Sequence, residues 1–179
     1  MSPNQYSMSE IIEFLKEKKL PLFIMMVGVP GSGKSTDVAF IKEHVLPDAV
    51  VASSDAIIER EAAKLGVNYT EAFNAVNQDS VQKEFWNDIQ EALDGNKSLI
   101  VDRTNLSEQS RKRFMNMVPD YYMRLAFVYR VDDTELKNRL QARESATGKH
   151  IPDNVMENMK KTFKEPTKSE GFDVILCLY

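Results

Sequence analysis

The chain has 179 residues, of which 42% are hydrophobic and 28% charged, and its formal net charge is −4 at pH 7. These values are typical of a single globular domain and exclude disordered and collagen-like chains. No apolar run approaches the roughly 20 residues of a membrane-spanning helix, and the N-terminus lacks the pattern of a secretion signal. The chain has a single cysteine, Cys177, and therefore no disulfide framework. We expect a cytoplasmic protein without membrane contact.

The charges are unevenly distributed along the chain. Residues 1–99 carry 9 Lys/Arg against 15 Asp/Glu, whereas residues 100–168 carry 14 against 10. The overall negative charge argues against general, nonspecific binding to nucleic acid. A local basic surface in the second half would attract a phosphate-bearing partner, but taken alone the excess is better explained by solvated helix faces.

Strand-like and helix-like runs alternate through the whole chain. Apolar periodicity and turn residues predict strands at 22–27, 49–52, 99–101, 122–131 and 172–178. They predict helices over 9–19, 70–93, 133–143 and 152–163, and helices that begin near residues 34, 55 and 107. This alternation predicts an α/β fold in which a doubly wound, parallel, five-stranded sheet has helices on both faces. We expect a single domain over residues 1–179, with a helical extension at 1–20 and a polar lid segment at about 143–152.

The first predicted strand runs directly into Gly28-Val-Pro-Gly-Ser-Gly-Lys-Ser-Thr36, which matches the G-x-x-x-x-G-K-[ST] motif at every position. Glycines let successive backbone N–H groups form a nest for phosphate oxygens, and the following helix directs its positive end at the same anion. The alternative, a glycine turn that binds nothing, does not explain the strand-loop-helix context. The motif therefore predicts binding of ATP with Mg²⁺ through Gly28, Pro30, Gly31, Ser32, Gly33, Lys34, Ser35 and Thr36.

Polar residues follow the other predicted strands at the same edge of the sheet, where ligands of open parallel sheets bind. Asp102 comes directly after the strand at 99–101, and together with Ser35 it is the candidate Mg²⁺ ligand. Asp55 follows the second strand and is suited to accept a proton from an attacking hydroxyl. Its alternative role is that of a helix N-cap, since the residues after it are predicted to be helical.

Two arginines, Arg139 and Arg143, lie four residues apart on the helix at 133–143 and so share one face. Beside a polar segment, such a pair is typical of a lid that closes over ATP and neutralises the transferring phosphoryl group. Arg143 is the stronger candidate. For Arg139, a simple ion pair with Glu135 one turn earlier explains the sequence equally well.

The motifs GVPGSGKST (28–36), SSD (53–55), VDRTNLS (101–107), IP (151–152) and EPTKSEGFDVI (165–175) together resemble those of the 5′-hydroxyl polynucleotide kinases of bacteriophages and bacterial RNA-repair proteins. The resemblance implies an adenylate-kinase-like core with strand order 2-3-1-4-5, ATP as donor, Mg²⁺, and a DNA or RNA 5′-hydroxyl as acceptor. It implies that Lys34 and Ser35 bind phosphate and metal, that Asp55 is the general base, and that Arg143 is the lid arginine.

One position departs from the phage pattern, in which an arginine three residues after the general base contacts the acceptor phosphate. Here that position is Ile58, and Arg60 or Arg103 would have to replace it. The favoured function is still ATP-dependent phosphorylation of a polynucleotide 5′-hydroxyl. Two alternatives stay open: a P-loop kinase for another hydroxyl, on a nucleoside, a small metabolite or a modified DNA base, and an NTP-binding switch without an acceptor.

Overall fold

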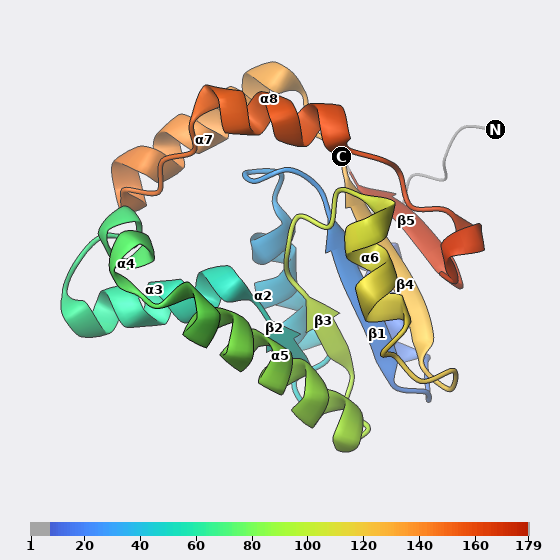
Figure 1. Cartoon of the computed structure of the whole chain (residues 1–179). Helices are drawn as coiled ribbons and strands as arrows, with labels where there is room; N and C mark the ends of the chain where they lie inside the picture. The colour runs from blue at the N-terminus through green and yellow to red at the C-terminus, as the bar shows by residue number, and fades with distance from the viewer. Residues whose placement is uncertain (1–7, 179) are drawn as a thin grey trace.

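The structure is a computed structural model that describes residues 8–178, and its strands form one sheet in the order β2-β3-β1-β4-β5 (Figure 1). All four strand pairs are parallel. The strands are β1 (Leu22–Val27), β2 (Val50–Ala52), β3 (Leu99–Val101), β4 (Met123–Tyr129) and β5 (Val174–Leu178). The fold class predicted from the alternating pattern and the strand order implied by the resemblance are both confirmed.

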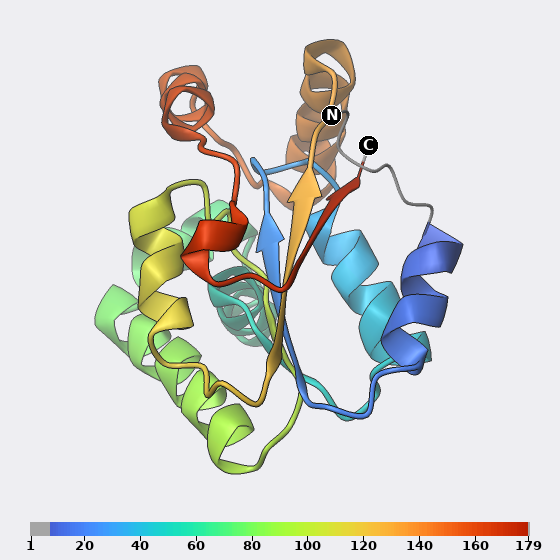
Figure 2. The ribbon, with the colours of Figure 1, turned by 90° about the vertical axis from the view of Figure 1, so that its right-hand side faces the viewer.

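Helices cover both faces of the sheet (Figure 2). One face carries α1 (Met8–Lys16) and α2 (Lys34–His44), and the other carries α3 (Ser54–Leu65), α5 (Gln78–Asp94) and α6 (Glu108–Met115). Above the carboxyl ends of the strands lie α7 (Asp133–Thr147) and α8 (Asp153–Thr162), and the short α4 (Tyr69–Ala75) lies beneath the corner that joins them (Figure 1). A 3₁₀ turn, Lys168–Glu170, precedes β5.

The core is divided by the sheet into two clusters. In β1, Phe23 and Met25 pack into the cluster beneath α3, α5 and α6, whereas Ile24 and Met26 pack into the cluster beneath α1 and α2. All six residues of β1 are buried, which is why the strand is a continuous apolar run rather than an alternating one.

The predicted helix over 70–93 is wrong, because the chain forms two helices there. Val76 is extended, and the side chain of Asn77 caps α5 by accepting a hydrogen bond of 3.1 Å from the backbone N–H of Ser80. A second cap, in which Asn68 and Glu71 bond each other's backbone N–H groups, begins α4. Phe73 therefore lies outside the apolar stripe of α5 and is 46% exposed.

Two other helix boundaries also differ from expectation. The helix predicted at 133–143 continues to Thr147, so half of the predicted lid segment is helical, and it ends at Gly148 in a left-handed conformation. The first helix ends at Lys16 rather than residue 19. The predicted extension at 1–20 can be compared only from residue 8 onward, and residue 179 also lies outside the described residues.

The strand register places the loops that follow β1, β2 and β3 side by side. Ala52 pairs with Val101, which pairs with Met25, so these three strands end within two residues of one another. The backbone N–H of Asp102 donates to the carbonyl of Ala52, at 3.0 Å, just beyond the paired residues. Between residues 8 and 178, no helix is long and apolar enough to cross a membrane.

Candidate active site

The phosphate loop lies between β1 and α2 and is held open by its glycines. Gly31 has φ +82°, a conformation that other residues rarely adopt, and a Cβ there would lie 3.0 Å from Leu140 Cδ2. The loop therefore packs tightly against α7, and only glycine fits at this contact. α2 begins at Lys34, so the positive end of its helix dipole is directed at the loop, as the motif predicts.

The Lys34 side chain is folded back over this loop. Its Nζ donates to the carbonyls of Gly28 and Val29, at 2.9 and 2.7 Å, and to Ser32 Oγ, at 3.3 Å. Burial lowers the pKa of Lys34 to about 8, although the nearby Asp102 and Asp55 carboxylates oppose that shift. A phosphate would supply the strong anionic partner that this buried ammonium lacks.

Ser35 and Asp102 lie together at the foot of the loop, and Ser35 Oγ donates a hydrogen bond of 2.8 Å to Asp102 Oδ2. Burial raises the pKa of the Asp102 carboxyl against the lowering effects of the Ser35 hydrogen bond and the Lys34 charge. A hydroxyl and a carboxylate beside a phosphate nest are donors that fit Mg²⁺. Residues 8–178 contain no group of three or more His, Cys, Asp or Glu that could hold a metal alone. Phosphate oxygens and water would therefore complete the coordination.

The loop after β3 supports the phosphate loop through its Thr-Asn pair. The backbone N–H of Gly28 donates to the Thr104 carbonyl at 3.0 Å, and Asn105 Nδ2 donates to the Met26 carbonyl at 2.7 Å. Asn105 is buried and has φ +47°, so its side chain is fixed beneath the start of the phosphate loop. Asn105 therefore positions the backbone, whereas Thr104 also lines the pocket.

A buried arginine secures the same loop and connects it to the C-terminal motif. Arg111 is fully buried, and its Nη1 donates to the Asn105 carbonyl at 3.0 Å. Its Nε and Nη2 also bind both oxygens of the Glu170 carboxylate, at 2.7 and 2.9 Å. The sequence analysis did not single out Arg111. The only available signal was the Glu170-Gly-Phe-Asp segment, which identifies the acceptor of this ion pair but not its donor.

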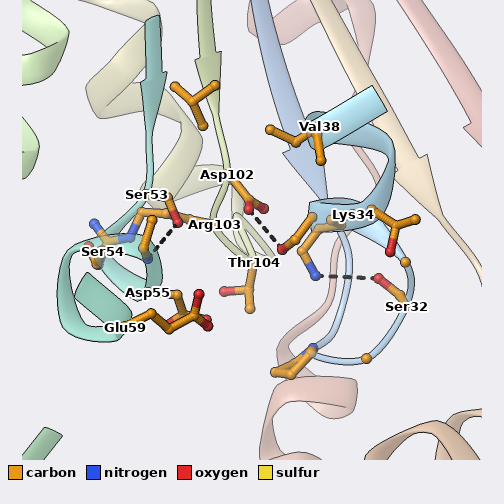
Figure 3. Close-up of a pocket in the computed structure, with 18 of the residues that line it drawn as sticks. Ser32, Lys34, Val38, Ser53, Ser54, Asp55, Glu59, Asp102, Arg103 and Thr104 are labelled. Carbon is orange, nitrogen blue, oxygen red and sulfur yellow. Dashed lines mark hydrogen bonds between the residues drawn. The ribbon is translucent and has the colours of Figure 1, made fainter. Parts of the chain in front are cut away.

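Asp55 lies in the first turn of α3, on the wall of the pocket opposite Lys34 (Figure 3). The alternative role as N-cap is wrong, because Ser53 is the cap and its side chain accepts from the backbone N–H of Ala56. Asp55 Oδ1 accepts a hydrogen bond of 2.8 Å from the Tyr69 hydroxyl. Its Oδ2 accepts from Lys149 Nζ.

Both predicted lid arginines line the pocket. Arg143 Nη2 lies 3.7 Å from Asp55 Oδ2, and Arg139 lies against the phosphate loop, 3.6 Å from where a Cβ on Gly33 would stand. Arg139 Nε also donates to Glu135 Oε1 at 2.7 Å. The ion pair with Glu135 is therefore present, and the same side chain lines the pocket, where the lid role stays a prediction.

The pocket between these walls has a volume of about 1160 Å³. Pockets for one small ligand commonly occupy roughly 300–1,000 Å³, so this one has room for a donor and an acceptor together. The described lining includes nearly all the residues predicted to bind nucleotide or to react, namely Pro30, Gly31, Ser32, Gly33, Lys34, Ser35, Thr36, Asp55, Asp102, Arg139 and Arg143. Gly28 is not among them, and its backbone N–H donates to the Thr104 carbonyl instead.

Of the two arginines considered as replacements at the acceptor position, only Arg103 lines the described pocket. Its guanidinium carbon lies 4.7 Å from the centre of the Phe85 ring. Burial lowers the pKa of Arg103, and the Asp55 charge opposes this shift. Arg60 Nη2 instead binds both carboxylate oxygens of Glu84, at 2.6 and 2.8 Å.

A family model described as "AAA domain" matches residues 23–166. The chain belongs to this AAA-domain family of P-loop proteins. It is 25% identical over 153 residues to a bifunctional polynucleotide phosphatase/kinase of Schizosaccharomyces pombe, and 29% identical over 159 residues to an L-seryl-tRNA(Sec) kinase of Methanococcus maripaludis. These matches cover 83% and 86% of this chain but only 31% and 56% of the two relatives. The resemblance to polynucleotide kinases is thereby confirmed at the level of homology.

Solved structures share the fold of this chain. A chain of the Pnkp1/Rnl/Hen1 RNA repair complex superposes with a TM-score of 0.64 at 21% identity, over 81% of this chain and 44% of that one. A gluconokinase from Sinorhizobium meliloti superposes with a TM-score of 0.53 at 18% identity, over 89% and 83%. At these identities the likeness supports the P-loop kinase fold alone.

Sequence reasoning missed two residues of this AAA-domain site, Tyr69 and Lys149. Both contact Asp55, from 14 and 94 residues away along the chain. Tyr69 lies one residue before the helix predicted at 70–93, which is in fact two helices. Lys149 lies within the polar lid segment predicted at about 143–152. Neither has a local pattern that marks it, because both contacts depend on how α4 and the end of α7 meet.

Proposed function

We propose that this protein is a Mg²⁺- and ATP-dependent kinase that transfers the γ-phosphate to the 5′-hydroxyl of a polynucleotide. The observation that carries the proposal is the position of Asp55, which faces the phosphate loop across a pocket large enough for two substrates. A carboxylate placed to accept a proton is needed by a kinase and not by a protein that only binds a nucleotide, and this favours the kinase over the NTP-switch alternative.

On the donor side, the backbone of the phosphate loop and Lys34 would hold the β- and γ-phosphates of ATP. Ser35 and Asp102 would hold Mg²⁺, which neutralises charge on those phosphates when it is bound. Arg143, and Arg139 beside the loop, would stabilise the charge on the phosphoryl group as it moves. These residues position the donor.

On the acceptor side, Asp55 would align the hydroxyl and accept its proton. The hydroxyl oxygen forms a bond to the γ-phosphorus while the bond from that phosphorus to the bridging β–γ oxygen breaks, and ADP leaves. The proton passes from the hydroxyl to an Asp55 oxygen. Each carboxylate oxygen has about two acceptor sites, so one site on each remains after the Tyr69 and Lys149 bonds are made.

Arg103 supports a nucleic-acid acceptor. It lies in the same pocket as Asp55 and is the nearest counterpart to an arginine that would bind the first phosphate beyond the 5′-hydroxyl. The second arginine considered for this role, Arg60, is held by Glu84. Kinship with a polynucleotide phosphatase/kinase points to the same class of acceptor.

A kinase for another hydroxyl is the second candidate, because the chain is also related to an L-seryl-tRNA(Sec) kinase. In that case the phosphorylated group would be a small hydroxyl compound, alone or carried by an RNA. Such an acceptor would place its hydroxyl at Asp55 in the same way. The donor side of the mechanism would not change.

The acceptor is identified by incubating the protein with γ-labelled ATP, Mg²⁺ and a panel of acceptors. The panel contains 5′-hydroxyl DNA and RNA oligonucleotides, the same oligonucleotides already carrying a 5′-phosphate, nucleosides, gluconate and seryl-tRNA. We expect label on the 5′-hydroxyl oligonucleotides and none on their 5′-phosphorylated controls. Label only on a nucleoside, gluconate or seryl-tRNA would replace the polynucleotide assignment. ATP binding without any labelled product would favour the switch.

A further inference from the structure

The Asp55 carboxylate binds a lysine that is not among the described residues lining the pocket. Lys149 follows the last residues of α7, its side chain is only 6% exposed, and its Nζ donates to Asp55 Oδ2. The Tyr69 hydroxyl donates to the other oxygen, Oδ1, at 2.8 Å. Among the described residues that line the pocket, Asp55 is present but Lys149 and Tyr69 are not. Both carboxylate oxygens therefore accept hydrogen bonds from groups outside the described pocket lining.

The backbone that carries Lys149 is docked against the start of α4. Gly148, which ends α7, has φ +68°, and a Cβ there would lie 3.0 Å from the Asn68 side chain. The Thr70 hydroxyl donates to the Gly148 carbonyl. Any larger residue at position 148 would have to displace the residue that caps α4. The end of α7 is therefore packed against the start of α4 through Gly148.

The Lys149 ammonium has several partners in addition to Asp55. Its Nζ lies 3.9 Å from the centre of the Tyr69 ring and 3.7 Å from Glu59 Oε1. An ammonium over an aromatic ring is held by the ring's electrons, more strongly when water is excluded. The lysine is thus oriented before any substrate binds.

We infer that Lys149 is a positioning residue, which fixes the orientation of the Asp55 carboxylate for the acceptor hydroxyl whenever the corner between α7 and α8 is docked on α4. The inference rests on the proposed function, in which Asp55 is the base. Because α7 also carries Arg139 against the phosphate loop and Arg143 to 3.7 Å from Asp55 Oδ2, one helix would place groups on both the donor and the acceptor side. Closure of α7 and α8 over ATP would then complete the acceptor site at the same time.

The electrostatics of the site agree with this role. Burial by itself raises the pKa of the Asp55 carboxyl, but the Lys149 charge and the hydrogen bonds from Lys149 and Tyr69 outweigh it and hold that pKa below its usual range. Removal of the lysine charge should therefore raise the pKa of Asp55. The charged and titratable groups that face this carboxylate from the surrounding elements are Lys149, Tyr69, Arg143, Lys34, Arg103 and Asp102.

The test compares Lys149→Met with Lys149→Arg and with a matched control, Lys160→Met. Lys160 of α8 also pairs with an aspartate, but with Asp133 at the start of α7 and not with Asp55. We expect Lys149→Met to lower kcat by about 10²-fold, the scale of a misplaced reacting group, with the KM for ATP within about twofold of wild type. Because a protonated Asp55 cannot act as a base, the acid limb of the kcat–pH profile should move to higher pH. Lys149→Arg should recover part of the loss, and Lys160→Met should change neither quantity.

A second measurement does not depend on activity, and it separates this inference from the proposed function. The Asp55 carboxyl carbon is titrated by NMR and assigned from its absence in Asp55→Asn. We expect a higher Asp55 pKa in Lys149→Met than in wild type and no change in Lys160→Met. If no oligonucleotide is phosphorylated, the proposed acceptor is wrong, and this titration still tests the contact.

An unchanged Asp55 titration together with an unchanged kcat in Lys149→Met would overturn the inference. So would a loss of kcat that Lys149→Arg does not recover and that leaves the pH profile in place, because that result would assign Lys149 a purely structural role. If Lys149→Met does not fold, as judged by circular dichroism, Lys149→Gln replaces it. Glutamine keeps much of the aliphatic stem but not the charge, and the outcomes stated for Lys149→Met then apply to Lys149→Gln.

Discussion

Ser35 Oγ donates a hydrogen bond of 2.8 Å to Asp102 Oδ2, and this bond joins the first turn of α2 to the residue that follows β3. Sixty-seven residues separate the two side chains in sequence, and the parallel register of β1 and β3 brings them together. The pair lies beside the phosphate loop, where a Mg²⁺ ion bound to ATP would stand. This relationship leads to the first prediction.

Asp102→Asn should raise the Mg²⁺ concentration required for half-maximal phosphoryl transfer by about 10–100-fold, since the amide keeps the shape but loses the charge. The measurement is the rate at saturating ATP over a Mg²⁺ series. Asp173→Asn is the matched control, because Asp173 accepts from the Arg124 backbone N–H at the opposite edge of the sheet. An unchanged Mg²⁺ requirement in Asp102→Asn would show that this carboxylate does not hold the metal.

Lys34→Ala should lower the transfer rate by about 10²–10³-fold, the usual cost of removing one group that stabilises developing charge in an active site. The fold should be retained, because the Lys34 hydrogen bonds are confined to the phosphate loop. The checks are the single-turnover rate and the thermal unfolding midpoint, with Lys64→Ala on the exposed face of α3 as control. A rate within tenfold of wild type would contradict the P-loop assignment.

The phosphate loop and the sheet could be predicted because their signals are local. Glycines at fixed spacing after a buried strand determine the loop, and alternation of strands and helices determines a parallel sheet. The rule that ligands lie at the carboxyl ends of the strands then placed Asp102 and Asp55 on the correct edge. Each of these steps needs only the order of residues along the chain.

The remaining features depended on contacts between distant segments. The break at Val76 and Asn77 follows from a cap that competes with a continuing helix, and the apolar spacing across it still resembled one helix. Lys149 reaches Asp55 only because Gly148 docks against α4. Arg111 has no pattern in the sequence that would reveal its complete burial against Glu170.

Arg143→Ala should lower kcat more than it weakens ATP binding, because its guanidinium would meet charge that develops during transfer. Arg139→Ala should have a smaller effect, since that side chain is shared with Glu135. The comparison requires kcat together with the ATP dissociation constant measured by equilibrium titration. A change confined to ATP affinity would show instead that Arg143 binds the nucleotide in the ground state and does not stabilise the transition state.

Arg103→Ala should raise the KM for a 5′-hydroxyl oligonucleotide and reduce the dependence of log KM on log salt concentration by about one phosphate contact. The KM for ATP should not change. Arg60→Ala is the control, because its guanidinium is bound to Glu84 outside the described pocket lining. If Arg60→Ala alone alters the salt dependence, the acceptor phosphate is bound by Arg60 and not by Arg103.

The measurement that tests the account most directly is single-turnover transfer of the γ-phosphate from ATP to a 5′-hydroxyl oligonucleotide by wild type, Asp55→Asn and Glu61→Gln. Asn keeps the size of the side chain, and Ser53 remains the cap of α3. Glu61 lies on the same helix but outside the described pocket lining, where it pairs with Lys64, so Glu61→Gln controls for the loss of a negative charge on α3. We predict that Asp55→Asn lowers the transfer rate by about 10²–10⁴-fold with ATP affinity unchanged, and that Glu61→Gln transfers normally. A normal rate in Asp55→Asn would contradict the claim that this carboxylate is the base of a kinase.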